Sequence, residues 1–281
     1  MESYIQAKLS LLTKPGLEFV VVNLDDAESA KFCEMTPKNA QLWGVSRHGK
    51  RVDYAESVIA TNVKTLTQGF AITVAWRTQQ QEFLLPLYGE FNVDNVLLVL
   101  AVLLALGIDF DQATQRLTRL QPIAGRMEAY IYPNSPSVFI DYAHTPDALA
   151  TVLSGVRQHC PQALWVVFGC GGNRDKGKRP LMRRAAERWA DRVIITDDNP
   201  RDENSADIIQ DIMSDADADK IVVMPDRASA IGYAIKHAQA NDCIVVAGKG
   251  HENYQEIKGV RYPFSDKQTV LTALNNKREM A

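Results

Sequence analysis

Four short polar segments in the second half of the sequence carry the side chains best suited to chemistry. They span residues 141–147, 169–179, 197–202 and 248–252, and each follows an apolar run. The second and fourth combine glycines, which let a ligand approach the backbone, with cations, which favour an anion. The third places Arg201 beside Asn199 and carboxylates, and a guanidinium can grip a carboxylate through two hydrogen bonds. Together the segments indicate a site for a small zwitterion next to an anion such as phosphate.

Each segment also has a structural interpretation, and these alternatives stay open. Thr145 is a good helix cap with Pro146 at the first helical position, and Asn199-Pro200 is a good turn. The cationic loop at 169–179 has the composition of a solvated surface loop. These interpretations leave Asp141 and His144 unexplained, so we keep a polar site as the working hypothesis.

The glycine-rich segment matches neither of two common nucleotide-binding motifs. Arg174 stands where a dinucleotide fingerprint needs glycine, and Arg179 stands where a P-loop needs serine or threonine. The cations at positions 174, 176, 178 and 179 instead predict an anion at the start of a helix. The sequence contains no Ser-His-Asp elbow, HExxH helix or zinc-type cluster, so catalysis by a covalent nucleophile has no support.

The elements that must position these segments alternate regularly from about residue 124. Strands are predicted at residues 138–141, 164–168, 193–196, 221–224 and 243–247. Helices are predicted at residues 147–159, 179–190, 206–213, 227–238 and from 265 onward, after a hairpin at Lys258-Gly259. This alternation predicts a doubly wound, mostly parallel, Rossmann-like α/β sheet. Ligands of such sheets bind at the carboxyl ends of the strands, where the polar segments lie.

The first 123 residues are less regular. The predicted elements are a helix over 1–12, a strand over 19–22, an antiparallel β-rich stretch over 40–88 and a helix over 93–106 that is apolar and buried on every face. Phe110, Ala113, Leu117 and Leu120 then share one helical face. These pieces do not make an obvious complete domain.

The composition is that of a globular protein of two domains. The chain has 281 residues, of which 46% are hydrophobic, and a net charge of −3. A net charge so close to zero does not indicate a basic surface that would bind nucleic acid. The apolar run at 96–106 is shorter than the ~20 residues of a membrane span. Glu2 and Gln6 interrupt any signal-peptide pattern, and the scattered cysteines predict buried thiols in a reducing compartment. We therefore expect a cytoplasmic protein.

The polar segments resemble those of the Mur ligases, in the order and on the loops where that family has them. Residues 125–128 and 89–95 also resemble family segments, and residues 4–8 resemble the helix that carries the family's carbamylated lysine. The resemblance covers essentially the whole chain. It implies a C-terminal ligase domain at residues 124–281, preceded by part of the central ATP-binding α/β domain at residues 1–123.

The resemblance also implies roles for the matching residues. The segment 198–201 matches the motif of the members that add meso-diaminopimelate. The residues implied to bind this amino acid are Arg174, Asp198, Asn199, Pro200, Arg201, Gly248 and Glu252. The residues implied to lie near the nucleotide are Asn92, Asn95, Arg126, Asp141 and His144. Lys8 is implied to be carbamylated and to help hold Mg²⁺, and burial would assist because only the neutral amine reacts with CO₂.

The implied reaction joins meso-diaminopimelate to UDP-N-acetylmuramoyl-L-alanyl-D-glutamate. ATP forms an acyl phosphate, which the amine attacks, and the full-length enzyme is expected to be a monomer. The chain holds neither a GxxxxGK[ST] motif nor the family's uracil-nucleotide domain, so we expect it not to form the acyl phosphate alone. A diaminopimelate-binding module without catalysis is an alternative. The lysine-adding and folate-polyglutamylating branches are others, although the 198–201 motif argues against them.

Overall fold

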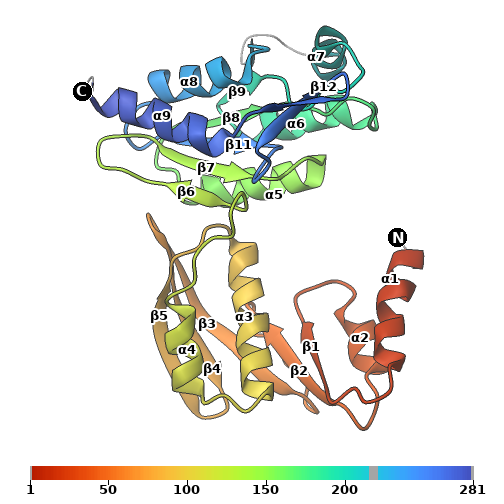
Figure 1. Cartoon of the computed structure of the whole chain (residues 1–281). Coiled ribbons are helices and arrows are strands. Elements are labelled where there is room, and N and C mark those ends of the chain that lie inside the picture. Colours follow the sequence, from red (N-terminus) through yellow and green to blue (C-terminus); the bar gives the residue numbers. More distant parts are fainter. Residues whose placement is uncertain (1, 215–220, 280–281) are drawn as a thin grey trace. The chain divides into compact units, whose positions relative to one another are not determined.

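The chain forms two compact α/β units, residues 1–121 and residues 122–281 (Figure 1). The computed structural model describes residues 2–214 and 221–279. Within these ranges, no helix is both long and apolar enough to cross a membrane. The predicted alternation of helix and strand in an α/β fold is confirmed.

The first unit is built on a five-stranded sheet with the order β1-β2-β3-β4-β5. Its strands are β1 (Phe19–Asn23), β2 (Gln41–Ser46), β3 (Glu56–Leu66), β4 (Gly69–Trp76) and β5 (Gln79–Leu85). The strands β3 to β5 are antiparallel, as predicted, but β2 runs parallel to both of its neighbours. The prediction of an entirely antiparallel stretch over 40–88 is therefore wrong, because the loop of residues 47–55 returns the chain to the starting end of β2.

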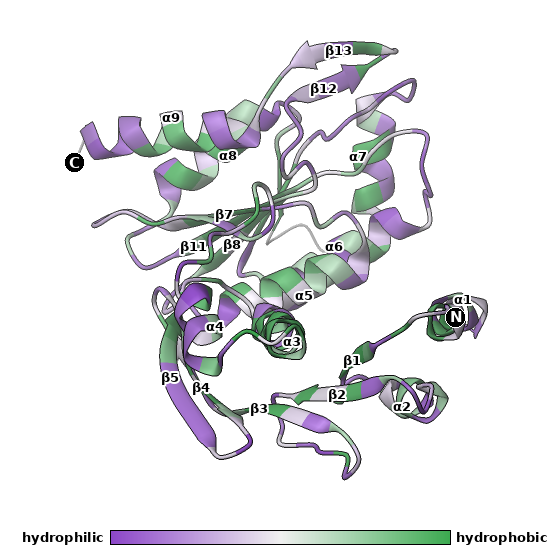
Figure 2. Ribbon diagram, turned by 60° about the horizontal axis from the view of Figure 1, so that its bottom comes forward, coloured by the Kyte–Doolittle hydropathy of each residue, from purple (hydrophilic) through white to green (hydrophobic). Residues whose placement is uncertain are grey.

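The helices of the first unit are α1 (Glu2–Leu9), α2 (Ser29–Met35), α3 (Glu90–Ala105) and α4 (Phe110–Leu117) among the described residues. The buried face of α4 is the predicted one, and it shares a core with α3 and the strands β2 to β5. Viewed end-on in Figure 2, α3 is green all round, yet Val99 is 44% exposed. The prediction that this helix is buried on every face is wrong, since the sheet and α4 cover only part of its surface.

The second unit is built on a six-stranded sheet with the order β10-β9-β8-β11-β7-β6. Its strands are β6 (Glu128–Tyr130), β7 (Ser137–Asp141), β8 (Leu164–Phe168), β9 (Arg192–Ile195), β10 (Ile221–Val223) and β11 (Cys243–Ala247). All but β6 are parallel, and the five parallel strands match their predicted positions to within one residue at each end. The antiparallel edge strand β6 was not predicted, because three half-buried residues carry no periodic signal.

The order of crossovers in this unit brings the ends of four strands together. The chain steps in one direction from β7 through β8 and β9 to β10, and it then returns to insert β11 between β8 and β7. The helices are α5 (Pro146–Arg157), α6 (Lys178–Trp189), α7 (Ser205–Met213), α8 (Arg227–His237) and α9 (Asp266–Glu279). Right-handed crossovers put α5 to α7 on one face and α8 on the other, and the packing of α5 on α6 and of α8 on α9 agrees. The carboxyl ends of β7, β11, β8 and β9 are thus neighbours.

Candidate functional site

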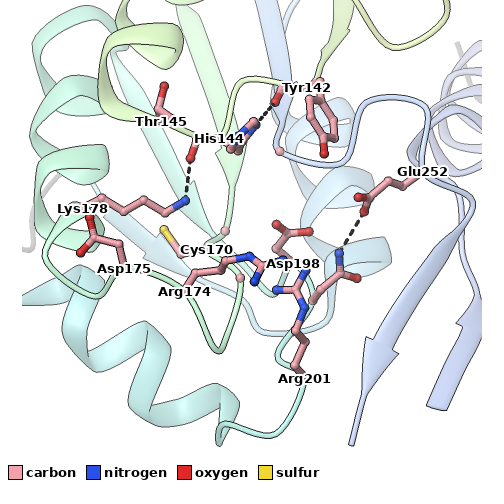
Figure 3. A pocket seen from close by; sticks show the side chains of 14 residues that line it. Tyr142, His144, Thr145, Cys170, Arg174, Asp175, Lys178, Asp198, Arg201 and Glu252 are labelled. Carbon is pink, nitrogen blue, oxygen red and sulfur yellow. Dashed lines mark hydrogen bonds between the residues drawn. The ribbon is translucent and has the colours of Figure 1, made fainter. Parts of the chain in front are cut away.

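A polar pocket of about 380 Å³ lies at these strand ends (Figure 3). It is lined by Tyr142, His144, Thr145, Gly169, Cys170, Gly171, Arg174, Asp175, Lys178, Asp198, Asn199, Arg201, Gly248 and Glu252. Its size is that of a small-molecule site, and all four polar segments of the sequence contribute to it. The expectation that these segments meet at one edge of the sheet is borne out by this geometry.

The glycines after β8 allow two loops to pack against each other. A Cβ on Gly169 would lie 2.2 Å from the carbonyl oxygen of Thr196, and one on Gly172 would lie 1.9 Å from that of Pro200. A Cβ on Gly171 would lie 2.8 Å from Nη1 of Arg201. Gly169 and Gly172 therefore permit contact between the loops after β8 and β9. Gly169 also lines the pocket, whereas Gly172 does not. Gly171 leaves room for the Arg201 side chain.

The four cations of this loop do not act together. Arg174 and Lys178 line the pocket, and the Lys178 ammonium donates to the carbonyl oxygen of His144 at 2.9 Å. Arg179 is fully buried and its guanidinium donates to Glu203 at 2.9 and 3.0 Å and to Asp211 at 2.7 Å. The prediction that all four cations face an anion is therefore wrong, because Arg179 ties α6 to the loop after β9 and to α7.

Arg201 is held from two sides. Its backbone is left-handed, with φ of 52°, and its N–H donates to the carbonyl oxygen of Glu256 at 3.0 Å, on β12 (Tyr254–Ile257). Its Nη1 donates to the carbonyl oxygen of Gly172 at 2.8 Å. Its Nε lies 3.8 Å from Oε2 of Glu256. The guanidinium lines the pocket close to Arg174 and Asp198 (Figure 3).

A hydrogen-bonded cluster lies at one wall of the pocket. The Asn199 amide donates from Nδ2 to Oε2 of Glu252 at 2.9 Å (Figure 3). The Lys249 ammonium is fully buried, donates to Oδ1 of Asn199 at 2.9 Å and lies 3.5 Å from Oδ1 of Asp198. Sequence reasoning placed Lys249 in a motif but gave it no role. The sequence alone carried no signal for this direction, because it is set by the packing of Gly250 against Gly125 and Tyr142.

Burial changes the pKa values of two groups in the pocket. Burial raises the pKa of the Asp198 carboxyl, against the opposing effect of the Arg227 and Lys249 cations. Burial likewise raises the pKa of the Cys170 thiol to about 12. The thiol is therefore protonated at neutral pH, which makes Cys170 a poor nucleophile. All four cysteines are free thiols, and Cys33, Cys170 and Cys243 are buried as predicted. Cys160 is half-buried, so the prediction of a buried thiol is wrong there.

The residues expected near a nucleotide fall into separate places. Asp141 accepts from the backbone N–H groups of Met127 at 2.9 Å and Ala143 at 2.7 Å, so its carboxylate holds the chain around the end of β7. The Arg126 guanidinium lies 4.6 Å from the Tyr142 ring centroid, and the His144 ring packs edge-on against the same tyrosine. Of these residues His144 lines the pocket.

Other predicted site residues lie outside the pocket lining. Asn95 donates to Asn92 at 3.3 Å on α3, in the first unit. Lys8 is exposed on α1, with its ammonium 4.7 Å from the Tyr4 ring centroid, so the burial expected to favour carbamylation is not present. Pro200 contributes its carbonyl oxygen to the contact with Gly172 instead of a pocket surface.

Within residues 2–214 and 221–279, no group of three or more His, Cys, Asp or Glu side chains is arranged to hold a metal ion.

Comparison with known proteins agrees with this architecture. The Mur ligase middle domain matches residues 1–103, and the Mur ligase, glutamate ligase domain matches residues 125–250. The UDP-N-acetylmuramoyl-L-alanyl-D-glutamate--2,6-diaminopimelate ligase of Coxiella burnetii is 43% identical over 98% of this chain and 56% of its own length. The protein of that name from Vibrio vulnificus is 42% identical over 98% of this chain and 55% of its own length.

A solved structure carrying the same protein name is also similar. It superposes with a TM-score of 0.71 at 35% identity, over 99% of this chain and 57% of that one. The chain thus spans a little over half the length of these relatives. Two domains in the family's order, on the fold of a solved relative, place this chain in the Mur ligase family.

Proposed function

We propose that this chain takes part in the ATP-dependent addition of meso-diaminopimelate to UDP-N-acetylmuramoyl-L-alanyl-D-glutamate, during the synthesis of peptidoglycan precursors. The main support for this proposal is that one pocket presents charges of both signs. The cations are Arg174 and Arg201, and the carboxylates are Asp198 and Glu252. meso-Diaminopimelate has two carboxylates and two ammonium groups, so it needs both signs. The names of the relatives support the same substrate pair.

One carboxylate and one ammonium group of the ligand have candidate partners. Arg201 and Arg174 would bind a carboxylate, because guanidinium donors match carboxylate geometry. Oε2 of Glu252 accepts hydrogen bonds from Asn199 and Lys249, so Oε1 would accept the hydrogen bond from an ammonium group of the ligand. Gly248, with φ of 115°, lines the pocket through its backbone. Pro200 would act indirectly, by holding the loop that carries Arg201.

The nucleotide side of the proposal rests on residues around Tyr142. Arg126 and His144 pack on this ring, and Lys178 reaches the same part of the pocket. A phosphoryl group there would meet cations that stabilise its developing charge. We also propose that Asn92, Asn95 and Asp141 lie near the nucleotide and that Lys8 is carbamylated. No step of this proposal depends on Mg²⁺. We also propose that the full-length enzyme is a cytoplasmic monomer.

Calorimetric titration of the 281-residue chain with meso-diaminopimelate tests this function. We expect saturable binding, little binding of L-lysine, which lacks the second carboxylate, and loss of affinity in Arg201→Ala. Losing a charge-assisted contact costs about 1.5–3 kcal/mol, or roughly ten- to a hundredfold in Kd.

The matched control is Arg188→Ala, since Arg188 packs over Trp189 on α6 and does not line the pocket. It should bind like the wild type. Equal affinity for lysine and meso-diaminopimelate, or an unaffected Arg201→Ala, would reject the proposal and revive the lysine-adding branch.

A binding module without catalysis is the second candidate. One observation favours it: every residue of the pocket lining belongs to residues 122–281, so binding needs nothing from the first unit. Measuring ADP release by the chain with ATP, meso-diaminopimelate and the nucleotide dipeptide tests whether the chain alone is such a module. We expect background release only, because the chain holds no GxxxxGK[ST] motif, and turnover well above background would exclude the module.

A further inference from the structure

Lys249 occupies an unusual position for a lysine. Its side chain is fully buried at the end of β11, between Gly248 with φ of 115° and Gly250 with φ of 54°. A Cβ on Gly250 would lie 2.8 Å from both the carbonyl oxygen of Gly125 and Cβ of Tyr142. The two glycines therefore permit a tight turn against neighbouring chain, and this turn points the lysine inward instead of into solvent.

The ammonium meets polar groups that line the pocket. It donates to Oδ1 of Asn199 at 2.9 Å and to Oε2 of Glu252 at 3.3 Å, and it lies 3.5 Å from Oδ1 of Asp198. The Tyr254 ring centroid is 5.7 Å away. One buried cation is thus in contact with three side chains that face the ligand.

These contacts decide which way the Asn199 amide points. Oδ1 of Asn199 accepts from Lys249 and also from the backbone N–H of Glu256 at 2.9 Å. Both partners are donors, so the oxygen must face them and Nδ2 must face Glu252. The Asn199 N–H group and the Lys249 ammonium then converge on Oε2 of Glu252, which turns Oε1 toward the pocket.

We infer that Lys249 is a positioning residue for the amino-acid ligand: it fixes the Asn199 amide and the Glu252 carboxylate in the orientation that receives an ammonium group. This inference rests on the proposed function. Lys249 also offsets one of the two negative charges of Asp198 and Glu252. The wall therefore keeps about one net negative charge, which suits a single ammonium.

Removing Lys249 has a cost in folding that the test must measure. Breaking a buried ion pair by removing one partner destabilises a protein, because the other charge stays buried without compensation. Lys249→Met keeps the length of the side chain and removes its donors and charge, and Asp198 and Glu252 then lose their cation. We therefore expect a less stable variant whose Asn199 amide and Glu252 carboxylate have lost their common anchor, and thermal unfolding checks that it is folded under the conditions of the binding test.

The test measures binding of meso-diaminopimelate to the 281-residue chain by calorimetry, with Lys249→Met beside the wild type. We expect at least a roughly tenfold rise in Kd. Lys277→Met is the matched control, since Lys277 donates to the carbonyl oxygens of Ile235, Lys236 and Ala238 and lies outside the pocket lining. That variant should lose stability and keep its affinity.

A second readout needs no ligand. In ¹H–¹⁵N spectra of the free chain, the side-chain amide signals of Asn199 should shift and broaden in Lys249→Met and return toward wild type in Lys249→Gln, which restores a neutral donor. If Lys249→Met does not fold, the affinity for meso-diaminopimelate and the amide signals of Asn199 are measured on Lys249→Gln and compared with the wild type. The loss of affinity expected for Lys249→Gln is smaller.

The outcomes separate the two claims. A wild-type chain that does not bind meso-diaminopimelate rejects the proposed function, and the free-chain spectra still decide whether Lys249 orients Asn199. A wild type that binds, together with a Lys249→Met variant of equal affinity, overturns the inference alone. Unchanged Asn199 signals in Lys249→Met also overturn it.

Discussion

At the scale of single residues, neighbouring cations in one loop have opposite roles. Arg174 reaches the pocket, whereas Arg179 is fully buried against Glu203 and Asp211. Their sequence context is the same glycine- and lysine-rich stretch, so residue type and spacing could not separate them. The difference lies in the acidic partners, which come from the loop after β9 and from α7.

The Arg179–Glu203 pair predicts a defined acid sensitivity. Hydrogen bonds from the Arg179 guanidinium lower the pKa of Glu203 from 4.5 to about 2. The native state thus favours the carboxylate, and its stabilisation is complete above pH 4.5 and is lost as the pH falls from there toward 2. Urea unfolding followed by circular dichroism should show Glu203→Gln losing less stability than the wild type across that window.

Glu82→Gln, at an exposed position of β5, is the control and should keep the wild-type slope. If Glu203→Gln and the wild type lose stability in parallel between pH 4.5 and 2, the pair does not contribute in this way.

At the scale of elements, the site depends on two loops that touch through glycine. Gly172 packs where a Cβ would lie 1.9 Å from the carbonyl oxygen of Pro200, next to the bond from Arg201 to the Gly172 carbonyl oxygen. The loop after β8 therefore sets the position of the Arg201 side chain, although Arg201 belongs to the loop after β9.

Gly172→Ala should weaken the second unit and its ligand binding together. Forced displacement of packed backbone typically costs about 1–3 kcal/mol, and the shift would carry Arg201 with it. Gly232→Ala is the control, because Gly232 lies in α8 with open space around it and alanine should add roughly 0.5–1 kcal/mol of stability. Thermal unfolding and titration with meso-diaminopimelate measure both. Wild-type affinity in Gly172→Ala would contradict this coupling.

The elements were also the level at which the sequence was most informative. The five parallel strands of the second unit are apolar runs bounded by turn residues, and all except β10 are largely buried. Their strong signal placed the pocket at the correct edge of the sheet. The parallel pairing of β2 escaped prediction because it depends on how the chain returns to the sheet, and the edge strand β6 escaped because three half-buried residues carry no periodic signal. The inward direction of Lys249 escaped because it depends on contacts of Gly250 with Gly125 and Tyr142, which lie far away in the chain.

At the scale of the whole molecule, the second unit holds everything the pocket needs. Its lining, its sheet and the apolar core of α8 and α9 all come from residues 122–281. A unit of this size buries enough surface to fold alone. We expect residues 122–281, produced separately, to unfold cooperatively and to bind meso-diaminopimelate within about threefold of the Kd of the 281-residue chain. A soluble, folded unit with no measurable binding would contradict this expectation.

The placement of β11 sets the order in which the pocket can form. In the sheet this strand lies between β7 and β8. In the chain, however, three strands (β8, β9 and β10) come between β7 and β11. Until it emerges from the ribosome, β7 and β8 have no shared neighbour, and contacts between such distant segments form slowly. Until then the facing edges of β7 and β8 present unpaired backbone N–H and C=O groups, which could pair with other chains. The pocket is therefore complete only after residues 243–247 have been synthesised and have paired with both strands.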